Sequence, residues 1–269
     1  MAVNITYLKP GETWYRRLWS ARELLWALAL RDIQVRYKQS ALGVAWAVVQ
    51  PLSMAIILSL VGMIMKIPSE GIPYPVFMYG AMVPWTLFSS SLSSSIPSVV
   101  GHGSLITKVY FPREVLPIAA VVGCVFDFLT ASFVLVPFMI FYRIAPSWHV
   151  VWIPLLLLMI MALVMGIGFA FSSINVFYRD IRSVVPLLVQ LWMFASPVMY
   201  PVSAVPARFR VWYSLNPMVG IIDGFRGALL LHRSPDPVLL MRGLPLILLV
   251  LVFGYRVFTA LERRFADVV

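Results

Sequence analysis

The sequence predicts an all-α polytopic membrane protein with six transmembrane helices, and two observations carry this prediction: its composition and its long uncharged stretches. Hydrophobic residues make up 61% of the 269 residues, charged residues only 12%, and the mean hydropathy is +0.90. A soluble domain is roughly half apolar and a quarter charged. Because too little polar surface remains to cover a water-soluble body, the composition excludes a soluble enzyme, a disordered tail and a nucleic-acid binder.

Residues 1–40 form a basic segment ahead of the first apolar stretch. The segment carries seven basic and three acidic residues with no uninterrupted apolar core, so we expect no signal peptide here. Apolar residues recur at three- and four-residue steps within 14–38, which predicts an amphipathic helix in the membrane interface. This helix is either a plain anchor or a collar that also touches a cytoplasmic partner. Its apolar stripe consists of Trp14, Leu18, Ala21, Leu25 and Leu28.

Six stretches with almost no charge follow, each close to the roughly 18 residues that a transmembrane helix needs. They cover residues 41–65, 76–100, 115–142, 150–174, 184–200 and 239–258. An even number of spans puts both chain ends on one side. With the ends inside, the inner segments hold 14 of the 21 Lys and Arg residues, and basic residues gather on the cytoplasmic side of membrane proteins. The sequence therefore predicts an N-in, C-in topology.

The loop 101–114 is short and lies inside in this topology. It can form a turn or two of helix before Pro112 stops it. We expect it to expose apolar and aromatic side chains, which suggests a docking surface; alternatively these side chains dip into the interface and the basic residues only mark the topology. The loop's candidate residues are Leu105, Ile106, Lys108, Tyr110, Phe111 and Arg113.

The outer segment 201–243 is too long, at 43 residues, for a simple turn. Its prolines keep any helix short, and two candidates are 205–215 and 217–231. The second would begin at Pro217 with Asn216 as its cap. Asp223 and Arg226, three residues apart, could pair on one helix face. Two short helices that dip into the outer leaflet are a hint of a pore or gate, since irregular backbone at that depth must face protein or water.

Each polar group inside the predicted spans could have a functional or a structural role. Asp127 lies in mid-span, where a carboxylate costs about 2.5 to 3.5 kcal/mol; it is a functional candidate, or it bonds a hydroxyl at a helix interface. The hydroxyl candidates are Thr130, Ser132 and Ser172. Seven serines between 89 and 98 either allow close helix packing, the reading we favour, or line a polar path. Trp85, Phe88 and Trp192 could face such a path and stack on sugar rings.

Several chemistries are missing from the sequence. It has no Gly-x-x-x-x-Gly-Lys-Ser/Thr phosphate loop, no His-Glu-x-x-His and no Gly-x-Ser-x-Gly. The three histidines, His102, His149 and His232, are scattered, so we expect no metal site, and the lone Cys124 excludes an intrachain disulfide. The chain itself is therefore not a P-loop ATPase and offers no catalytic residue.

Four stretches together resemble the permease subunit of bacterial ABC-2-type polysaccharide exporters, the O-antigen, capsule and teichoic-acid family. The likeness covers nearly the whole chain and marks the superfamily rather than one substrate. The stretches are 30–40 with Leu42, Gly43, Trp46, Gln50 and Pro51; 105–117; 175–181; and 196–200 followed by Asn216 and Pro217.

The resemblance implies a homodimer in the bacterial inner membrane that works with two copies of a separate ATPase subunit, which would bind ATP and Mg. The cargo would be a lipid-linked polysaccharide. Residues 1–40 would hold the interface helix and 41–269 the transmembrane domain. Within that domain, 104–112 would be the coupling helix and 201–233 the outer gate helices. The gate residues would be Pro197, Tyr200, Asn216, Pro217, Asp223 and Arg226.

Three other functions remain open on the sequence. The same architecture could export teichoic acid, another lipid or a drug. A channel or secondary transporter without an ATPase would need several buried charges along the spans, and only Asp127 is of this kind. A membrane-embedded transferase would need a cluster of acidic residues at one interface, which the eleven scattered acids do not provide.

Overall fold

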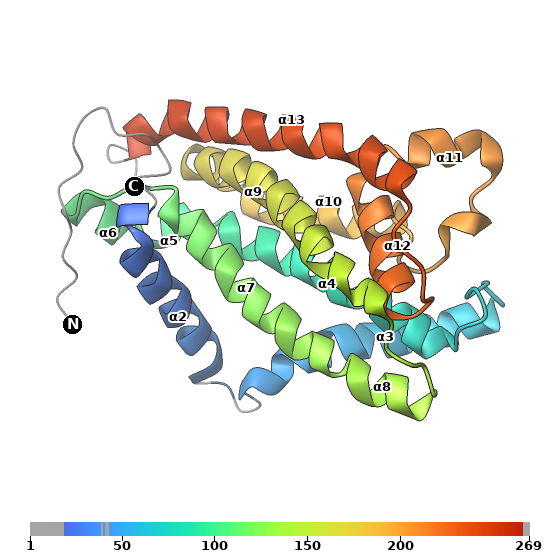
Figure 1. Ribbon diagram of the computed structural model, residues 1–269. Helices are drawn as coiled ribbons and strands as arrows, with labels where there is room; N and C mark the ends of the chain where they lie inside the picture. The colour runs from blue at the N-terminus through green and yellow to red at the C-terminus, as the bar shows by residue number, and fades with distance from the viewer. Residues whose placement is uncertain (1–18, 39, 41–42, 266–269) are drawn as a thin grey trace.

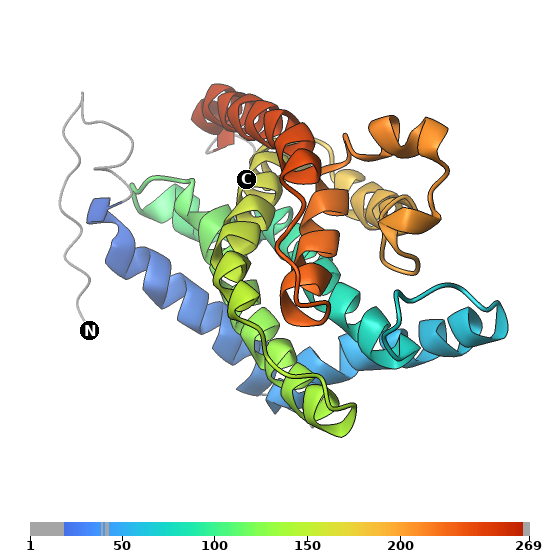
Figure 2. The same ribbon diagram turned by 45° about the vertical axis from the view of Figure 1, so that its right-hand side comes forward.

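The computed structural model describes residues 19–38, 40 and 43–265, and this part of the chain is helical with no strand (Figure 1). Figures 1 and 2 show α6 (Gly103–Lys108) and the C-terminal end of α13 (Pro237–Leu261) at one end of the molecule. At the opposite end, α11 (Ala207–Tyr213) stands off from the bundle. The molecule therefore has two distinct ends, joined by long helices.

Each predicted span overlaps a helix in the described part of the chain. The helices are α3 (Trp46–Ile64), α4 (Tyr74–Ser95), α7 (Val115–Phe133) continued by α8 (Leu135–Phe141), α9 (Ile153–Phe177), α10 (Ile181–Phe194) and α13. Four helical stretches within the described residues are long and apolar enough to cross a membrane: Gly43–Ile64, Val115–Phe141, Trp148–Phe177 and Pro237–Arg264.

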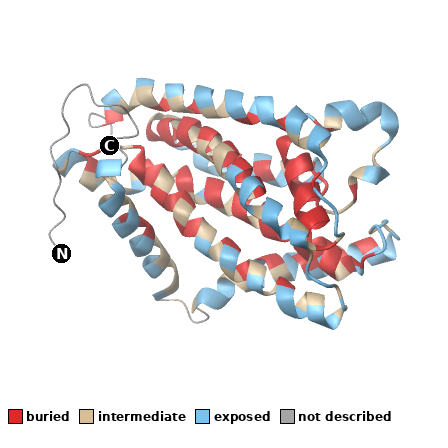
Figure 3. Cartoon of the chain, in the orientation of Figure 1, coloured by how far each residue is buried: buried red, intermediate tan, exposed pale blue. Residues whose placement is uncertain are grey.

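The two remaining helices, α4 and α10, are not both long and apolar enough to be counted among these four, for different reasons. At 22 residues α4 is long enough, but it is rich in serine. It lies at the centre of the bundle with most of its side chains buried (Figure 3). Its surroundings are therefore mainly neighbouring helices rather than lipid, and they accommodate a more polar helix. At 14 residues, α10 extends only about 21 Å, against roughly 30 Å of hydrocarbon. It begins and ends earlier than the expected 184–200.

The seam between α9 and α13 is a backbone contact. Gly166 and Gly254 face each other so closely that a Cβ on either residue would overlap the other helix's backbone. Small residues let membrane helices approach in this way. The two helices run side by side in both ribbon views, and α13 turns its opposite face outward.

The N-terminal helix α2 (Arg22–Lys38) packs against α7. Leu28 is buried and Ala21 and Leu25 are half-buried, so this part of the expected apolar stripe faces the protein. Trp14 and Leu18 lie outside the described residues. Trp26 of α2, by contrast, is exposed, as is Trp19, which precedes the helix. Both faces of this helix therefore carry apolar residues.

Candidate functional site

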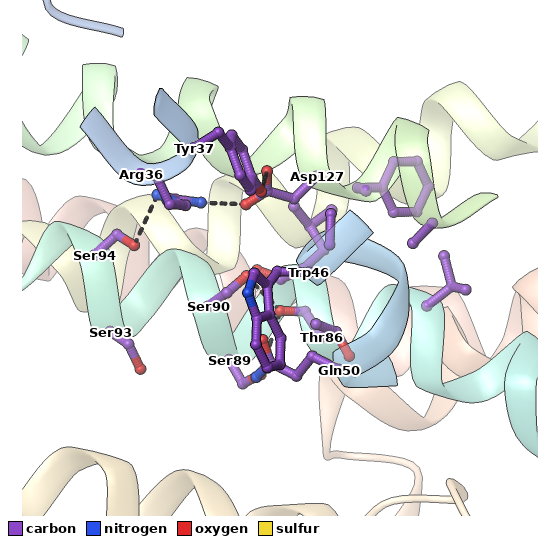
Figure 4. Close-up of a pocket in the computed structure, with 15 residues that line it drawn as sticks. Arg36, Tyr37, Trp46, Gln50, Thr86, Ser89, Ser90, Ser93, Ser94 and Asp127 are labelled. Atoms are coloured by element: carbon purple, nitrogen blue, oxygen red, sulfur yellow. Dashed lines mark hydrogen bonds and ion pairs between the residues drawn. The ribbon is translucent and has the colours of Figure 1, made fainter. Parts of the chain in front are cut away.

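A polar hollow of about 440 Å³ lies between α2, α3, α4 and α7 (Figure 4). Its polar lining comes from four helices: Arg36 and Tyr37 from α2, Trp46 and Gln50 from α3, Thr86, Ser89, Ser90, Ser93 and Ser94 from α4, and Asp127 from α7. A second hollow of about 350 Å³ shares Gln50, Thr86, Ser89 and Ser93 with the first and extends to α10 through Gln190. We call the two together the serine hollow.

The serines of α4 divide by helix face. Thr86, Ser89, Ser90, Ser93 and Ser94 follow the three- and four-residue spacing of one face and line the serine hollow. Ser91 and Ser95 are buried on the other face, where the Ser95 hydroxyl lies against Gly168 of α9. Ser98, which begins the short helix α5 (Ser98–Gly101), is buried as well. The expectation that the α4 serines serve packing therefore holds for one face and is wrong for the other.

Asp127 is the charged centre of the hollow. Its carboxylate forms an ion pair with Arg36 and accepts a hydrogen bond from the Tyr37 hydroxyl, and Arg36 also donates to Ser94 Oγ at 3.4 Å. Burial raises the pKa of Tyr37, and its hydrogen bond to Asp127 raises it further, so the phenol stays a neutral donor. The three helices α2, α4 and α7 thus meet at one ion pair.

The expected hydroxyl partners of Asp127 are wrong. Thr130, Ser132 and Ser172 instead donate to carbonyls of their own helices, at 2.9, 2.7 and 3.3 Å. The actual partners lie about ninety residues away in the sequence, at separations of 91 and 90. One signal pointed to them: Leu25, Leu28, Asp32 and Arg36 continue one helix face at four- and three-residue steps, which turns a charge toward the protein.

The three aromatic candidates pack against one another in tilted and edge-to-face contacts. Ring centroids of Trp85 and Phe88 are 5.4 Å apart, and those of Phe88 and Trp192 are 5.2 Å apart. Of the three, Phe88 is fully buried and Trp85 alone lines the serine hollow. Trp192 donates from Nε1 to Asn216 Oδ1 at 2.9 Å. The aromatic ring most open to the hollow is Trp46, which is 50% exposed.

At the opposite end from α11, the residues around α6 split into exposed and buried sets. Tyr110 is 78% exposed and Lys108 is exposed, while Leu105 is half-buried. Ile106 and Phe111 are only 6% and 5% exposed and pack in a second apolar core with α2, α7 and α13, so the expectation that they are exposed is wrong. Arg113 donates to the Glu262 carbonyl, which fastens the loop to the end of α13.

Two helices form in the outer segment, α11 and α12 (Pro217–Leu229). The Asn216 side chain caps α12 by accepting from the Met218 amide at 3.1 Å, as predicted. Asn216 also donates to the carbonyl of Ala195 and the hydroxyl of Ser196, both at 3.0 Å. This side chain therefore joins the start of α12 to the end of α10.

The predicted pairing of Asp223 with Arg226 is wrong. Asp223 instead accepts from Arg233 at 2.9 Å. Arg226 is 2% exposed, donates to the carbonyls of Phe77, Pro197, Val198 and Tyr200, and lies over the Phe77 ring at 3.6 Å. The turn after α10 exposes carbonyls without a helical partner, and Arg226 satisfies them. Tyr200 completes this cap by donating to the Phe194 carbonyl at 3.0 Å.

These features together define a helical membrane protein with a hydroxyl-lined hollow and two distinct ends. A family model described as ABC-2 type transporter matches residues 23–230, and the chain belongs to this family. The permease of this family is a transport subunit and is not itself catalytic. The chain is accordingly a multi-pass protein of the inner membrane.

Three similar proteins extend the match. An O-antigen export system permease protein RfbA from Myxococcus xanthus is 31% identical over 94% of this chain and 97% of its own length. A protein of the same name from Klebsiella pneumoniae is 31% identical over 91% of this chain and 95% of its own length. The polysialic acid transport protein KpsM from Escherichia coli is 26% identical over 76% of this chain and 80% of its own length.

Proposed function

We propose that this chain is the membrane-spanning subunit of an ATP-driven exporter that moves a lipid-linked cell-surface polysaccharide, such as an O-antigen, from the cytoplasm to the outer side of the inner membrane. The serine hollow is the observation that carries the proposal. A hydrated polymer cannot cross about 30 Å of hydrocarbon unaided, and the five hydroxyls on one face of α4 can replace water as hydrogen-bond partners of a sugar. The half-exposed Trp46 offers a flat apolar face to a sugar ring.

The proposed topology has six crossings with both ends inside. To the four apolar helices it adds α4, which neighbouring helices enclose, and α10, which the 195–200 turn extends. In this arrangement 1–40 is the cytoplasmic segment and 41–269 the transmembrane domain. The helices α11 and α12 are the re-entrant outer gate, and the Arg226 contacts with the turn after α10 support a rigid link between gate and span.

The proposed assembly is a homodimer with two copies of a cytoplasmic ATPase that holds ATP and Mg. The sequence supports a separate ATPase because it has no phosphate loop of its own. The exposed face of α10, which includes Leu187, Leu188 and Leu191, supports a partner helix or lipid at that side. An exporter needs an inward and an outward state whose balance the ATPase shifts.

In this assembly the segment 104–112 is the coupling helix. Tyr110 and Lys108 project from it and would contact the ATPase, whereas Ile106 and Phe111 anchor the segment to the core. A displacement of Lys108 and Tyr110 by the ATPase would be transmitted along the chain through Arg113 to the start of α7.

The nearest alternative is an exporter of teichoic acid, another lipid or a drug on the same architecture. A hydroxyl-lined path favours a glycan over an apolar drug, because burying unpaired hydroxyls against apolar cargo is unfavourable. An ATP-independent channel is less well supported, since among the described residues the charges in the hollow, Arg36 and Asp127, are paired with each other.

The deciding experiment is a mild-detergent purification of the tagged protein from its own membranes, combined with an export assay in cells that lack it. We expect an ATP-hydrolysing subunit to co-purify in equal amount, and lipid-linked polysaccharide to accumulate inside the deleted cells. A protein that purifies alone and restores export without any ATPase would overturn the pump and favour the channel. Restored export of a different lipid would keep the pump and change its cargo.

A further inference from the structure

Another cavity, separate from the serine hollow, opens on the surface of the helical bundle between α7, α9 and α13. It has a volume of about 550 Å³. Its apolar lining runs along α9 from Met161 to Phe169, about 12 Å at the helical rise, and is completed by Ile118, Leu251 and Val252. The polar lining residues, Glu114, Tyr255, Arg256 and Thr259, belong to the ends of α7 and α13 that lie near α6. The groove is therefore amphiphilic along its length.

Among the described residues, neither charge at the polar end of the groove has a hydrogen-bond or ion-pair partner. Glu114 is 7% exposed, and no other described residue forms a hydrogen bond or ion pair with its carboxylate. Arg256 is exposed on α13, and its guanidinium likewise has no partner among residues 19–38, 40 and 43–265. A buried carboxylate is costly unless a cation or donor pairs with it.

We infer that this groove binds a phospholipid with a primary ammonium headgroup, phosphatidylethanolamine. One acyl chain lies along Met161, Met165 and Val252, the phosphate meets Arg256, and the ammonium donates to Glu114. The order of charges fits a zwitterion, since a purely anionic headgroup would meet the Glu114 carboxylate and gain only from Arg256. The site itself does not depend on the exporter's cargo. In the proposed topology its polar end, near α6, lies in the inner leaflet.

Phosphatidylcholine is a close chemical control for this lipid. It has the same phosphate and acyl chains, but its quaternary ammonium has no hydrogen to donate to Glu114. Phosphatidylglycerol has the phosphate without any cation. Comparing these three lipids separates the contribution of Glu114 from that of Arg256 and from the apolar groove.

The test is native mass spectrometry of the full-length permease, in complex with whatever subunits co-purify, after exchange into each lipid. We expect phosphatidylethanolamine to be retained about tenfold over phosphatidylcholine, which corresponds to about 1.4 kcal/mol. Glu114→Gln should abolish this preference and raise retention of phosphatidylglycerol. Arg256→Gln should lower retention of all three, and Arg264→Gln, which does not line the groove, should change none.

Val252→Trp is the second variant, and it keeps the test valid if the buried Glu114→Gln change impairs folding. Val252 is exposed, so a Trp there fills the groove without disturbing the interior. It should remove the retained lipid and leave the oligomeric state unchanged. Equal retention of the three lipids by the wild type, an unchanged preference in Glu114→Gln, or a Val252→Trp variant that keeps its lipid but changes its oligomeric state would each overturn the inference.

Discussion

Asp127 shows how much of a site depends on contacts that the local sequence does not encode. Its carboxylate was visible in the sequence as an isolated charge in an apolar span, but its partners Arg36 and Tyr37 lie in a different helix. Local spacing identifies which face of a helix turns inward, and it did so for α2. It does not say which of several inward faces meet, since that depends on how α2 packs across α7.

Asp127→Asn should lower stability more than it alters the pH dependence of transport. The variant leaves the Arg36 guanidinium without its counter-charge, and we expect a loss of about 1 to 2 kcal/mol, the lower part of the range for a charged hydrogen bond because Arg36 is partly exposed. Thermal unfolding in detergent measures this loss. Thr130→Val, whose hydroxyl bonds only its own helix, is the matched control, and a transport pH profile that lost an ionisation would reverse the assignment.

Arg226→Gln should disrupt the outer cap. The shorter amide cannot reach the carbonyls of Pro197, Val198 and Tyr200 together, and each buried acceptor left unpaired costs about 1 to 3 kcal/mol. We expect a sharp fall in folded yield by size-exclusion chromatography. Arg208→Gln removes an exposed arginine of α11 and should behave as the wild type; equal yields of the two variants would contradict the role given to Arg226.

At the scale of the elements, all six predicted spans correspond to helices because long apolar runs in a chain of this composition have few other stable forms. The ends of the helices were less predictable. The end of α10 at Phe194 depends on Pro197 and on the Arg226 cap, and Arg226 is distant in sequence. The burial of Ile106 and Phe111 was missed for a similar reason, since the core that covers them is built from α2, α7 and α13.

Tyr110→Ala and Phe111→Ala should have different effects, although the two residues are adjacent. Loss of the exposed Tyr110 should leave the fold intact and separate ATP hydrolysis from export. Loss of the buried Phe111 should cost about 3 to 5 kcal/mol of stability. Unfolding temperature, ATPase rate and export, measured on the same preparations, distinguish these outcomes, and full export by a stable Tyr110→Ala variant would exclude the docking role of this tip.

The two faces of α4 can be compared in the same way. Ser93→Val replaces an exposed hydroxyl of the serine hollow and should reduce export while stability stays nearly constant. Ser95→Val adds volume where α4 meets Gly168 and should destabilise by about 1 to 3 kcal/mol through overpacking. If Ser93→Val exports normally and Ser95→Val unfolds normally, the division of α4 into a path face and a packing face is wrong.

At the scale of the whole molecule, labelling of single cysteines tests the six-span topology, because the chain has only one cysteine and Cys124 is buried. On a Cys124→Ser background, cysteines at Ala145 and Ser234 should react with a membrane-impermeant reagent added from outside. Cysteines at Ser104 and Ser183 should react only after the membrane is opened. All four sites are exposed, so any reversal reports topology and not burial.

The close approach of Gly166 and Gly254 has a consequence for how the protein is made. Synthesis runs from the N-terminus, so α9 is complete before α13 leaves the ribosome, and until then α13 does not cover Gly166 of α9. The helix α13 must then pack against a surface of α9 that the earlier part of the chain has already formed. A chain that stops before residue 237 would leave Gly166 uncovered by α13, so the contact between the two helices forms only after α13 has been made.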